Sequence, residues 1–342
     1  MRAPFEISGI DIEAGSRAFV SIPLPELQSQ TPMSMQAHVV HGRKDGPSLF
    51  VCAAVHGDEI NGVEIIRRIL SMPALKRLKG TLIAVPIVNV YGFHNHSRYL
   101  PDRRDLNRQF PGRQMGSLAG RLANIFMSQI VSQADIGIDL HSAAIHRDNF
   151  PQIRADLNDA QLKPLARAFG AAVLLHSAPP EGSLRGAAAA IQVPVMVFEG
   201  GEALRFDESS IRIGVGGIVN VMRTLHMLPL SNHLPSKPAA LLRSSVWVRA
   251  SRSGILRARV KLGDRVGKDD QLAVIADPSG LGEEVVSATS DGIIIGRTNI
   301  PLVYEGEALF HIARTSETAQ QDSLRDEMIL APPELIEEPA IV

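Results

Sequence analysis

The chain has 342 residues, of which 45% are hydrophobic and 21% are charged, and its formal net charge is −1. This balance gives no global field that would attract nucleic acid or an anionic membrane, so any partner must be recognised locally. The single cysteine excludes an intramolecular disulfide framework, and Cys52 lies in an apolar run that predicts a packed thiol. Residues 1–15 carry acids where a signal peptide needs an apolar core, and no stretch offers the ~20 apolar residues of a membrane helix. We therefore expect a soluble, cytoplasmic protein.

A chain of this length predicts one large domain and a smaller one, because single cores rarely grow beyond about 250–300 residues. Two strand-like runs, 17–25 and 33–42, predict an antiparallel edge. After them the expected strands cover 48–55, 80–90, 134–143, 172–177 and 193–201, and the expected helices cover 61–72, 116–133 and 159–171. Helices that alternate with near-continuous apolar strands indicate an α/β domain, with a mainly parallel sheet covered on both faces.

The pattern changes near the proline-containing segment 228–245, which predicts a linker. Beyond it lie short strands and turns, and two similar segments, 254–276 and 292–313, predict the halves of a small β-sandwich or barrel. We place the domains at 1–232 and 233–315. The acidic tail 316–342 is unpatterned, so it is expected either to be disordered or to lie across a neighbour, such as a second subunit.

Four polar residues follow the predicted strands at the points where the strands end: His56, Asn89, His141 and Glu199. In an open parallel sheet, ligands bind outside the carboxyl ends of the strands. The sequence therefore predicts that these side chains meet at one rim.

His56, Glu59 and His141 form a candidate metal site. A catalytic zinc ion takes three protein ligands from His and carboxylate groups and leaves one position for water. His56 and Glu59 lie in a loop that enters a helix, and His141 would complete the set from a neighbouring strand. Asp139 lies on the same face of its strand as His141, so it is either an outer acceptor for that imidazole or the partner of a turn. In the alternative interpretation, His56 and Glu59 merely cap the next helix, as Asp58 could do.

Further candidates lie at two other places. In the segment 97–112, Arg103 and Arg104 are typical of a solvated loop, whereas Arg108, after Asn107 and before a stiff Gln-Phe-Pro-Gly, indicates a guanidinium presented to a carboxylate. Glu199 leaves an apolar strand, which is costly unless the carboxylate is paired or functional. It is either a general base beside a metal-activated water or half of a structural ion pair.

The motifs HGDE, DLNRQFPG, DLHSA and FEGG, in this order, resemble the succinylglutamate desuccinylase and aspartoacylase family, which is related to the zinc carboxypeptidases. The resemblance covers about residues 40–230. It implies a carboxypeptidase-like α/β domain with one zinc ion held by His56, Glu59 and His141.

The same resemblance implies that Glu199 is the catalytic acid and base and that Arg98 polarises the scissile carbonyl. Asn107 and Arg108 would hold the substrate carboxylate, and Arg185 would touch the substrate. Residues 187–190 are alanines near the place where aspartoacylases carry another substrate-binding arginine, which argues against N-acetylaspartate as the substrate.

The C-terminal segments are similar to the halves of a biotinyl/lipoyl domain. Those domains attach their cofactor to a lysine between the halves, and residues 276–292 contain none, so we expect neither group. A β-domain in this position narrows access to the site in the family, which makes Tyr304 a candidate to reach it.

Together these features predict hydrolysis of a small N-acylated amino acid or a related compound, with no nucleic acid or membrane as partner. Two alternatives stay open. One is a zinc carboxypeptidase acting on peptides, and the other is a non-catalytic binding protein that uses its β-domain for interaction.

Overall fold

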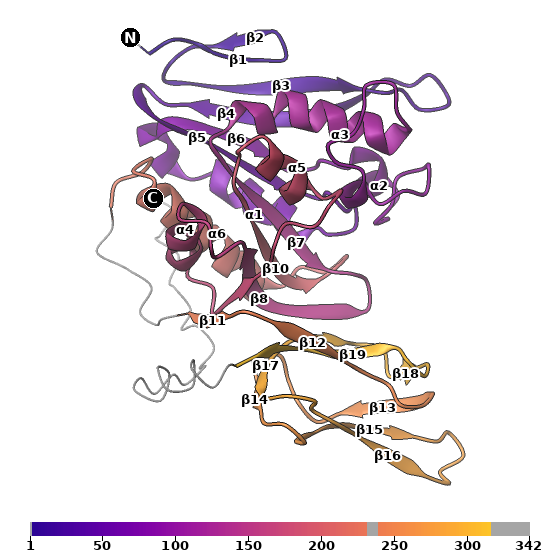
Figure 1. Ribbon diagram of the computed structural model, residues 1–342. Coiled ribbons are helices and arrows are strands. Elements are labelled where there is room, and N and C mark those ends of the chain that lie inside the picture. The colour runs from indigo at the N-terminus through magenta and orange to yellow at the C-terminus, as the bar shows by residue number, and fades with distance from the viewer. Residues whose placement is uncertain (1, 231–238, 316–342) are drawn as a thin grey trace.

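The computed structural model describes residues 2–230 and 239–315, so the predicted tail and the centre of the predicted linker lie outside it (Figure 1). Most of the strands belong to one mixed sheet of 13 strands. Ten of them follow one another across the sheet in the order β3 (Ser16–Leu24), β4 (Met33–His41), β6 (Lys79–Val85), β5 (Lys44–Ala53), β7 (Ile136–Ala143), β10 (Val195–Glu202), β8 (Arg147–Ala155), β17 (Gly292–Thr298), β19 (Ala308–Arg314) and β12 (Ser245–Arg249). The others are β9 (Val173–His176), β11 (Ala240–Leu242) and β14 (Arg265–Val266).

The centre of this sheet is parallel, as predicted. Strands β6, β5, β7 and β10 run in one direction, while β4 pairs antiparallel with β6, and β3 with β4. The two N-terminal runs therefore form the expected antiparallel edge. Because the central strands are parallel, their carboxyl ends lie at one edge, where the polar residues that follow them collect.

Helices cover both faces of the sheet, which confirms the predicted layers (Figure 1). Alternate residues of β5 point to opposite sides: Leu49 and Val51 belong to one core, and Phe50 and Cys52 to the other. The first core includes α1 (Asn61–Leu70), α4 (Leu162–Phe169) and α6 (Glu208–Thr224). The second includes α3 (Leu118–Gln129) and α5 (Leu184–Ala190).

The shorter elements refine the predicted boundaries. The expected strand 80–90 ends at Val85, and the chain then forms α2 (Val90–His94); the expected helix 116–133 ends at Gln129 and continues as η3 (Val131–Gln133). The remaining short elements are β1 (Phe5–Ile7), β2 (Ile10–Ile12), η1 (Pro73–Arg77) and η2 (Leu106–Arg108).

Between residues 239 and 315 the structure contains strands and no helix. A second sheet consists of β16 (Glu283–Ser287), β15 (Gln271–Ala276), β13 (Gly254–Ala258) and β18 (Leu302–Val303). The two similar segments exchange their short strands: β14 of the first pairs with β17 of the second, and β18 of the second pairs with β13 of the first. This reciprocal pairing is the structural counterpart of the internal repeat.

The C-terminal strands do not stand apart from the α/β sheet. Strand β8, which the sequence did not predict, pairs with β17 through residues 147–149 and with β9 through residues 152–155. Pro151 lies where the neighbour changes, and a residue without an N–H is tolerated at such an interruption of the ladder. One continuous sheet thus joins the two parts of the molecule.

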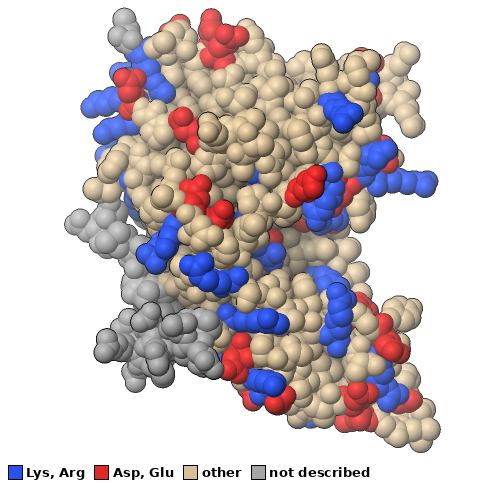
Figure 2. Space-filling view, in the orientation of Figure 1, with Lys and Arg blue, Asp and Glu red and all other residues tan. Residues whose placement is uncertain are grey.

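The surface matches the near-neutral composition. Figure 2 shows Lys and Arg side chains interspersed with Asp and Glu on the face in view. Within the described ranges, no helix is both long and apolar enough to cross a membrane.

A pair of adjacent glycines tests the packing of α6 on α4. A Cβ at Gly217 would lie 2.1 Å from the Cε1 atom of Phe169, whereas a Cβ at Gly216 would meet nothing within 4 Å. We expect Gly217→Ala to lower the free energy of unfolding by roughly 1 to 3 kcal/mol, because the buried ring must move. Denaturant unfolding monitored by circular dichroism measures the change.

Gly216→Ala is the matched control in the same helix. It should raise the free energy of unfolding by roughly 0.5 to 1 kcal/mol, because alanine loses less backbone entropy than glycine on folding. Equal effects of the two substitutions would show that α6 does not pack as described.

Candidate active site and metal centre

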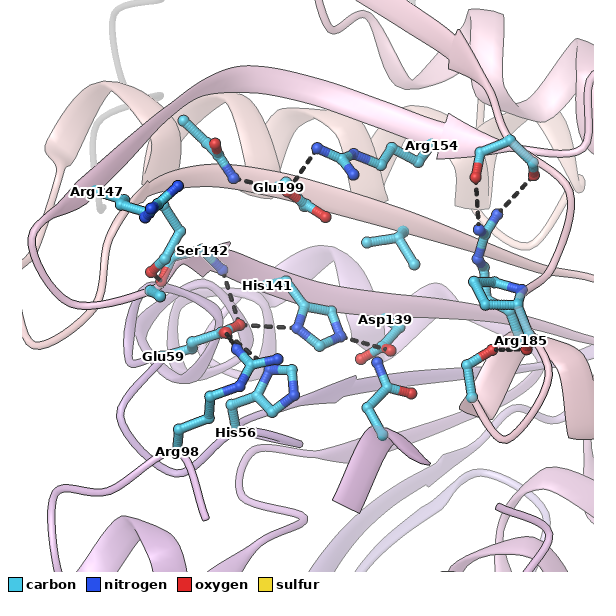
Figure 3. Close-up of a pocket in the computed structure, with 18 of the residues that line it drawn as sticks. His56, Glu59, Arg98, Asp139, His141, Ser142, Arg147, Arg154, Arg185 and Glu199 are labelled. Carbon is cyan, nitrogen blue, oxygen red and sulfur yellow. Dashed lines mark hydrogen bonds and ion pairs between the residues drawn. The ribbon is translucent and has the colours of Figure 1, made fainter. Parts of the chain in front are cut away.

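A pocket of about 300 Å³ lies at the carboxyl ends of the central strands. All eight predicted site residues line it: His56, Glu59, Arg98, Asn107, Arg108, His141, Arg185 and Glu199. Figure 3 shows six of these eight with labels, converging from separate strands and loops. Asn89 lies at the same rim but does not line the pocket, because it caps α2, its side chain accepting a hydrogen bond from the Gly92 amide at 2.8 Å.

The carboxylate of Glu59 lies between two imidazoles. Its Oε1 atom is 2.7 Å from Nδ1 of His56, and its Oε2 atom is 2.8 Å from Nδ1 of His141. The backbone amide of Ser142 also donates to Oε2, at 3.0 Å. One ligand atom from each of the three predicted residues lies within 4.8 Å of the others, so the group could hold a metal ion.

The chain reaches this geometry through local turns. After β5, Ala54 adopts a φ of 50°, a left-handed conformation that is uncommon for a residue with a Cβ and typical of functional sites. Helix α1 has Ile60 at its N-cap and no side-chain cap, so the alternative in which His56 and Glu59 cap that helix is wrong.

Each imidazole presents its second nitrogen to an outer carboxylate. Nε2 of His141 lies 2.8 Å from Asp139 Oδ2, and Nε2 of His56 lies 3.0 Å from Asp105 Oδ1. Both Nδ1 atoms are thereby left for a central ion. Metal-binding histidines usually have this arrangement, in which the second ring nitrogen donates to a carboxylate. The thiol of Cys52 is buried and donates to Asp139 Oδ1 at 3.3 Å, which confirms that it is packed. Asp139 is therefore an outer acceptor rather than the partner of a turn.

The electrostatics favour a cation at the centre. Burial opposes the charge on Glu59, but the attraction of His56 and His141 outweighs it and lowers the pKa of this carboxyl. Burial also opposes protonation of His141, yet the charges of Asp139 and Glu59 raise its pKa. The imidazoles must be neutral to bind a metal, and the cluster would then carry three carboxylates against the Arg98 guanidinium, a formal charge of −2 that a divalent cation would balance. Without an ion, protonation of the two imidazoles, which their raised pKa values favour, would balance the same charge.

Arg98 is tied to this cluster. Its NH2 group lies 3.0 Å from Asp105 Oδ2, and its NH1 group lies 3.3 Å from Glu59 Oε1. Nδ2 of the Asn89 side chain donates a hydrogen bond to the Arg98 carbonyl oxygen at 3.4 Å. Asn89 therefore supports the position of a pocket residue without entering the pocket.

Glu199 faces the pocket from β10, with one of its two oxygens engaged. Asn149 Nδ2 donates to Oε2 at 2.7 Å, and Arg154 NH2 lies 3.3 Å from the same atom. Within residues 2–230 and 239–315 no hydrogen bond or ion pair reaches Oε1. The ion pair that was the structural alternative for Glu199 exists, but it leaves one carboxylate oxygen free for chemistry.

The other predicted residues close the opposite part of the pocket. Asn107 Oδ1 accepts from the Leu184 amide at 2.9 Å, which joins the segment of Arg108 to the start of α5. Arg185 is buried and donates to two backbone carbonyls and to the hydroxyl of Ser177. Burial lowers the pKa of the Arg185 guanidinium from its usual value.

The sequence did not indicate five residues that line the pocket, Ser142, Arg147, Asn149, Arg154 and Trp247, nor Asp105, which contacts His56 from outside it. Three of them belong to the unpredicted β8, so no expected strand end pointed to them. Tyr304 is 79% exposed and does not line the pocket; Trp247 of β12 approaches it from the C-terminal strands instead.

The family model of the succinylglutamate desuccinylase/aspartoacylase catalytic domain matches residues 45–225, which is more than half of the chain. The chain belongs to this family. The family resemblance of the four motifs is thereby confirmed. N-alpha-acetyl-L-2,4-diaminobutyric acid deacetylase from Halomonas elongata is 26% identical over 324 residues, which cover 90% of this chain and 95% of the relative.

Solved structures share the fold over nearly the whole length. A succinylglutamatedesuccinylase/aspartoacylase from Rhodobacter sphaeroides has a TM-score of 0.79 at 24% identity, covering 91% of this chain and 99% of the other. The product-bound ectoine utilization protein EutE (DoeB) from Ruegeria pomeroyi has a TM-score of 0.80 at 23% identity, covering 92% and 100%. The likeness extends beyond the catalytic domain, so the C-terminal strands are also part of the shared architecture.

Substitutions in the candidate metal site should distinguish a residue that binds the ion from a residue that orients it. We expect His141→Ala to abolish stoichiometric metal binding, because it removes a ligand, and Asp139→Asn to weaken binding by about 10- to 100-fold, because it removes the charge that orients His141. Elemental analysis gives the stoichiometry, and competition with a chelator gives the affinity.

His94→Ala is the control, because His94 is exposed and lies outside the cluster. It should keep the metal content of the wild type. Retention of metal by His141→Ala at wild-type affinity would contradict the proposed ligand set.

Proposed function

We propose that the chain is a zinc-dependent hydrolase that deacylates a small N-acyl amino acid or a related compound, with one zinc ion per chain. The observation that carries this proposal is the convergence in one pocket of a His56, Glu59 and His141 cluster with the half-free carboxylate of Glu199. The name of the Halomonas elongata relative, a deacetylase of an N-acetylated amino acid, supports the same reaction class.

Zinc in such a site, when bound, supplies a water of lowered pKa and polarises the scissile carbonyl. Glu199 accepts the proton of the attacking water on its free Oε1 atom and later delivers that proton to the leaving nitrogen. Arg98 stabilises the negative charge that develops on the carbonyl oxygen. Asn107 and Arg108 hold the substrate carboxylate and so place the amide beside the base.

The proposed division of labour fits the contacts of each group. The Arg108 guanidinium donates to the Asn107 carbonyl and has no carboxylate partner within residues 2–230 and 239–315, so it is available to a ligand. The Oδ1 atom of Asn107 is engaged by the protein, which leaves its amide nitrogen for an acceptor on the substrate.

We also propose the domain boundaries, the partner and the compartment of the chain. We place the domain boundary at residue 232 and the end of the second domain at residue 315, and we interpret the C-terminal strands as a biotinyl/lipoyl-like sandwich without an attached cofactor. The partner is a small molecule and the compartment is the cytoplasm, and a homo-oligomer stays open as the assembly.

The central test is Glu199→Gln. We expect kcat to fall by about 10²- to 10⁴-fold on N-acyl amino acids, because glutamine cannot accept the proton, while the metal content stays at that of the wild type. Turnover is measured as release of free amine, and metal by elemental analysis. A panel of short peptides assayed in parallel separates deacylation from carboxypeptidase activity.

Wild-type turnover by Glu199→Gln would show that another group is the base. No hydrolysis of any N-acyl amino acid or peptide by the zinc-loaded wild type would remove the hydrolase proposal and favour a binding protein.

The position of Glu199 depends on the C-terminal strands through Asn149. Asn149 pairs with Gly296 of β17, and a Cβ at Gly296 would lie 2.9 Å from the Asn149 Oδ1 atom. We expect both Asn149→Ala and Gly296→Ala to lower kcat by roughly 10- to 100-fold with little change in KM, because the base loses its fixed orientation. Steady-state kinetics with zinc-loaded protein measures the split.

Gly282→Ala is the matched control, since a Cβ at this glycine, in the turn between β15 and β16, meets nothing within 4 Å. It should leave kcat, KM and zinc content unchanged. An unchanged kcat in both Asn149→Ala and Gly296→Ala would show that Asn149 does not position the base.

A further inference from the structure

Strand β8 contacts the candidate base from two sides. It runs antiparallel beside β10, where Glu199 pairs directly with Gln152. The side chain of Gln152 turns away and donates to the Ile295 carbonyl at 3.3 Å. The residues that reach the carboxylate lie before and after Gln152 in the sequence: Asn149 and Arg154, at 2.7 and 3.3 Å from the Oε2 atom.

An irregularity of the pairing brings these two side chains to the same face. Asn149 and Arg154 are an odd number of positions apart, so in a regular strand they would point to opposite faces of the sheet. The register shifts between residues 199 and 201 of β10, whose partners in β8 are residues 152 and 149, so β8 has one residue more than β10 there. This β-bulge reverses the alternation, and bulges beside functional sites commonly re-aim a side chain in this way.

Arg154 has the candidate base as its only ion-pair partner among the residues that the structure describes. Its NH2 group lies 3.3 Å from Glu199 Oε2, and its side chain is 25% exposed. Its Nε atom is buried and forms no hydrogen bond within residues 2–230 and 239–315. Figure 3 shows the guanidinium directed at the carboxylate. The charge of Arg154 is therefore balanced by Glu199 alone.

The groups around Arg154 on other elements cannot take the place of that carboxylate. Arg185 of α5 is itself a cation, and burial and the charge of Arg154 lower its pKa. Burial and the same charge lower the pKa of His311 of β19 to about 3, so this imidazole is neutral. Protonation of Glu199 would thus leave a partly buried guanidinium without a counter-ion, which costs free energy.

The two contacts also determine which oxygen of Glu199 carries a proton. Asn149 and Arg154 both present N–H groups to Oε2, so a proton on that atom would face two donors. No hydrogen bond or ion pair from the described part of the chain reaches Oε1. The proton that the attacking water loses is therefore carried on Oε1.

We propose that Arg154 acts through Glu199 as a positioning residue and promotes the second proton transfer of the reaction, from Glu199 to the leaving nitrogen. This inference rests on the proposed function and deepens it. In the first step, the water oxygen forms a bond to the carbonyl carbon and one water proton moves to Oε1. In the second, that proton moves from Oε1 to the amide nitrogen and the C–N bond breaks with its electron pair on the nitrogen. The products are a carboxylic acid and a free amine, and Arg154 regains its charged partner.

An ester that matches the amide substrate isolates the second transfer. An amide nitrogen must be protonated before it leaves, whereas an alkoxide can leave without prior protonation. The pair consists of the best substrate in the panel of N-acyl amino acids and the ester in which oxygen replaces its NH, such as O-acetyl-L-lactate for N-acetyl-L-alanine. We expect Arg154→Met and Arg154→Gln to lower kcat by about 100-fold on the amide and by less than about 10-fold on the ester, with little change in KM.

Three further variants separate charge from orientation. Arg154→Lys keeps the charge and should recover part of the loss on the amide. Asn149→Ala removes a neutral donor to the same oxygen, so it should lower kcat equally on both substrates. Arg205→Met is the control for loss of one positive charge, since Arg205 is exposed and lies outside the pocket, and it should behave as the wild type. Zinc content and thermal unfolding are measured for every variant.

The nitrogen kinetic isotope effect is a second readout and requires no ester. With heavy nitrogen in the scissile amide, the isotope effect on kcat/KM should be larger for Arg154→Met than for the wild type, because C–N cleavage then limits the rate. A loss of folding stability alone would not change this effect.

Equal losses on the amide and the ester, or an unchanged isotope effect, would overturn the inference and leave the hydrolase proposal intact. A KM that rises for both substrates at an unchanged kcat would also overturn it, because Arg154 would then bind the substrate instead of acting on the base. If the zinc-loaded wild type hydrolyses no amide, the proposed function fails and this inference fails with it.

Discussion

The burial of one ionised carboxylate organises the site. Glu59 is almost fully buried, and a carboxylate in such a place is stable only with opposite charge and hydrogen bonds around it. Two imidazoles, a backbone amide and a guanidinium supply them, and each imidazole is in turn held by an outer carboxylate. This requirement accounts for the polar residues that follow β5 and β7 at the carboxyl edge of the sheet.

The second constraint is that strand β8 has two different neighbours along one of its edges. One half of the strand pairs with β9 of the α/β domain and the other with β17 of the C-terminal strands. Because a sheet fixes its members to within a fraction of a residue spacing, the C-terminal strands cannot shift without moving β8. Residues of β8 contact the candidate base and line the pocket. A shift of the C-terminal strands would therefore also move residues at the candidate site.

The sequence was informative where burial imposes a pattern. Central strands that are covered on both faces form continuous apolar runs, and a polar residue at the end of such a run, as at His141 or Glu199, is conspicuous. Strand β8 has no such pattern, because it begins with three polar residues and contains Pro151, and one of its neighbours, β17, lies more than a hundred residues away in the chain. The sequence therefore did not point to Asn149 and Arg154, and Asn89, although it lies at the predicted rim, turned out to cap a helix rather than to line the pocket.

The charges of the pocket fall into two classes. Every acid is engaged by protein groups, so the negative charge serves the metal ligands and the base, whereas part of the positive charge is left unpaired. Unpaired charge in a partly buried site costs free energy in the empty protein, and a ligand of opposite sign recovers that cost on binding. In the proposed function, the metal ligands and Glu199 act on the scissile bond, and the arginines without carboxylate partners favour ligands that carry an anionic group.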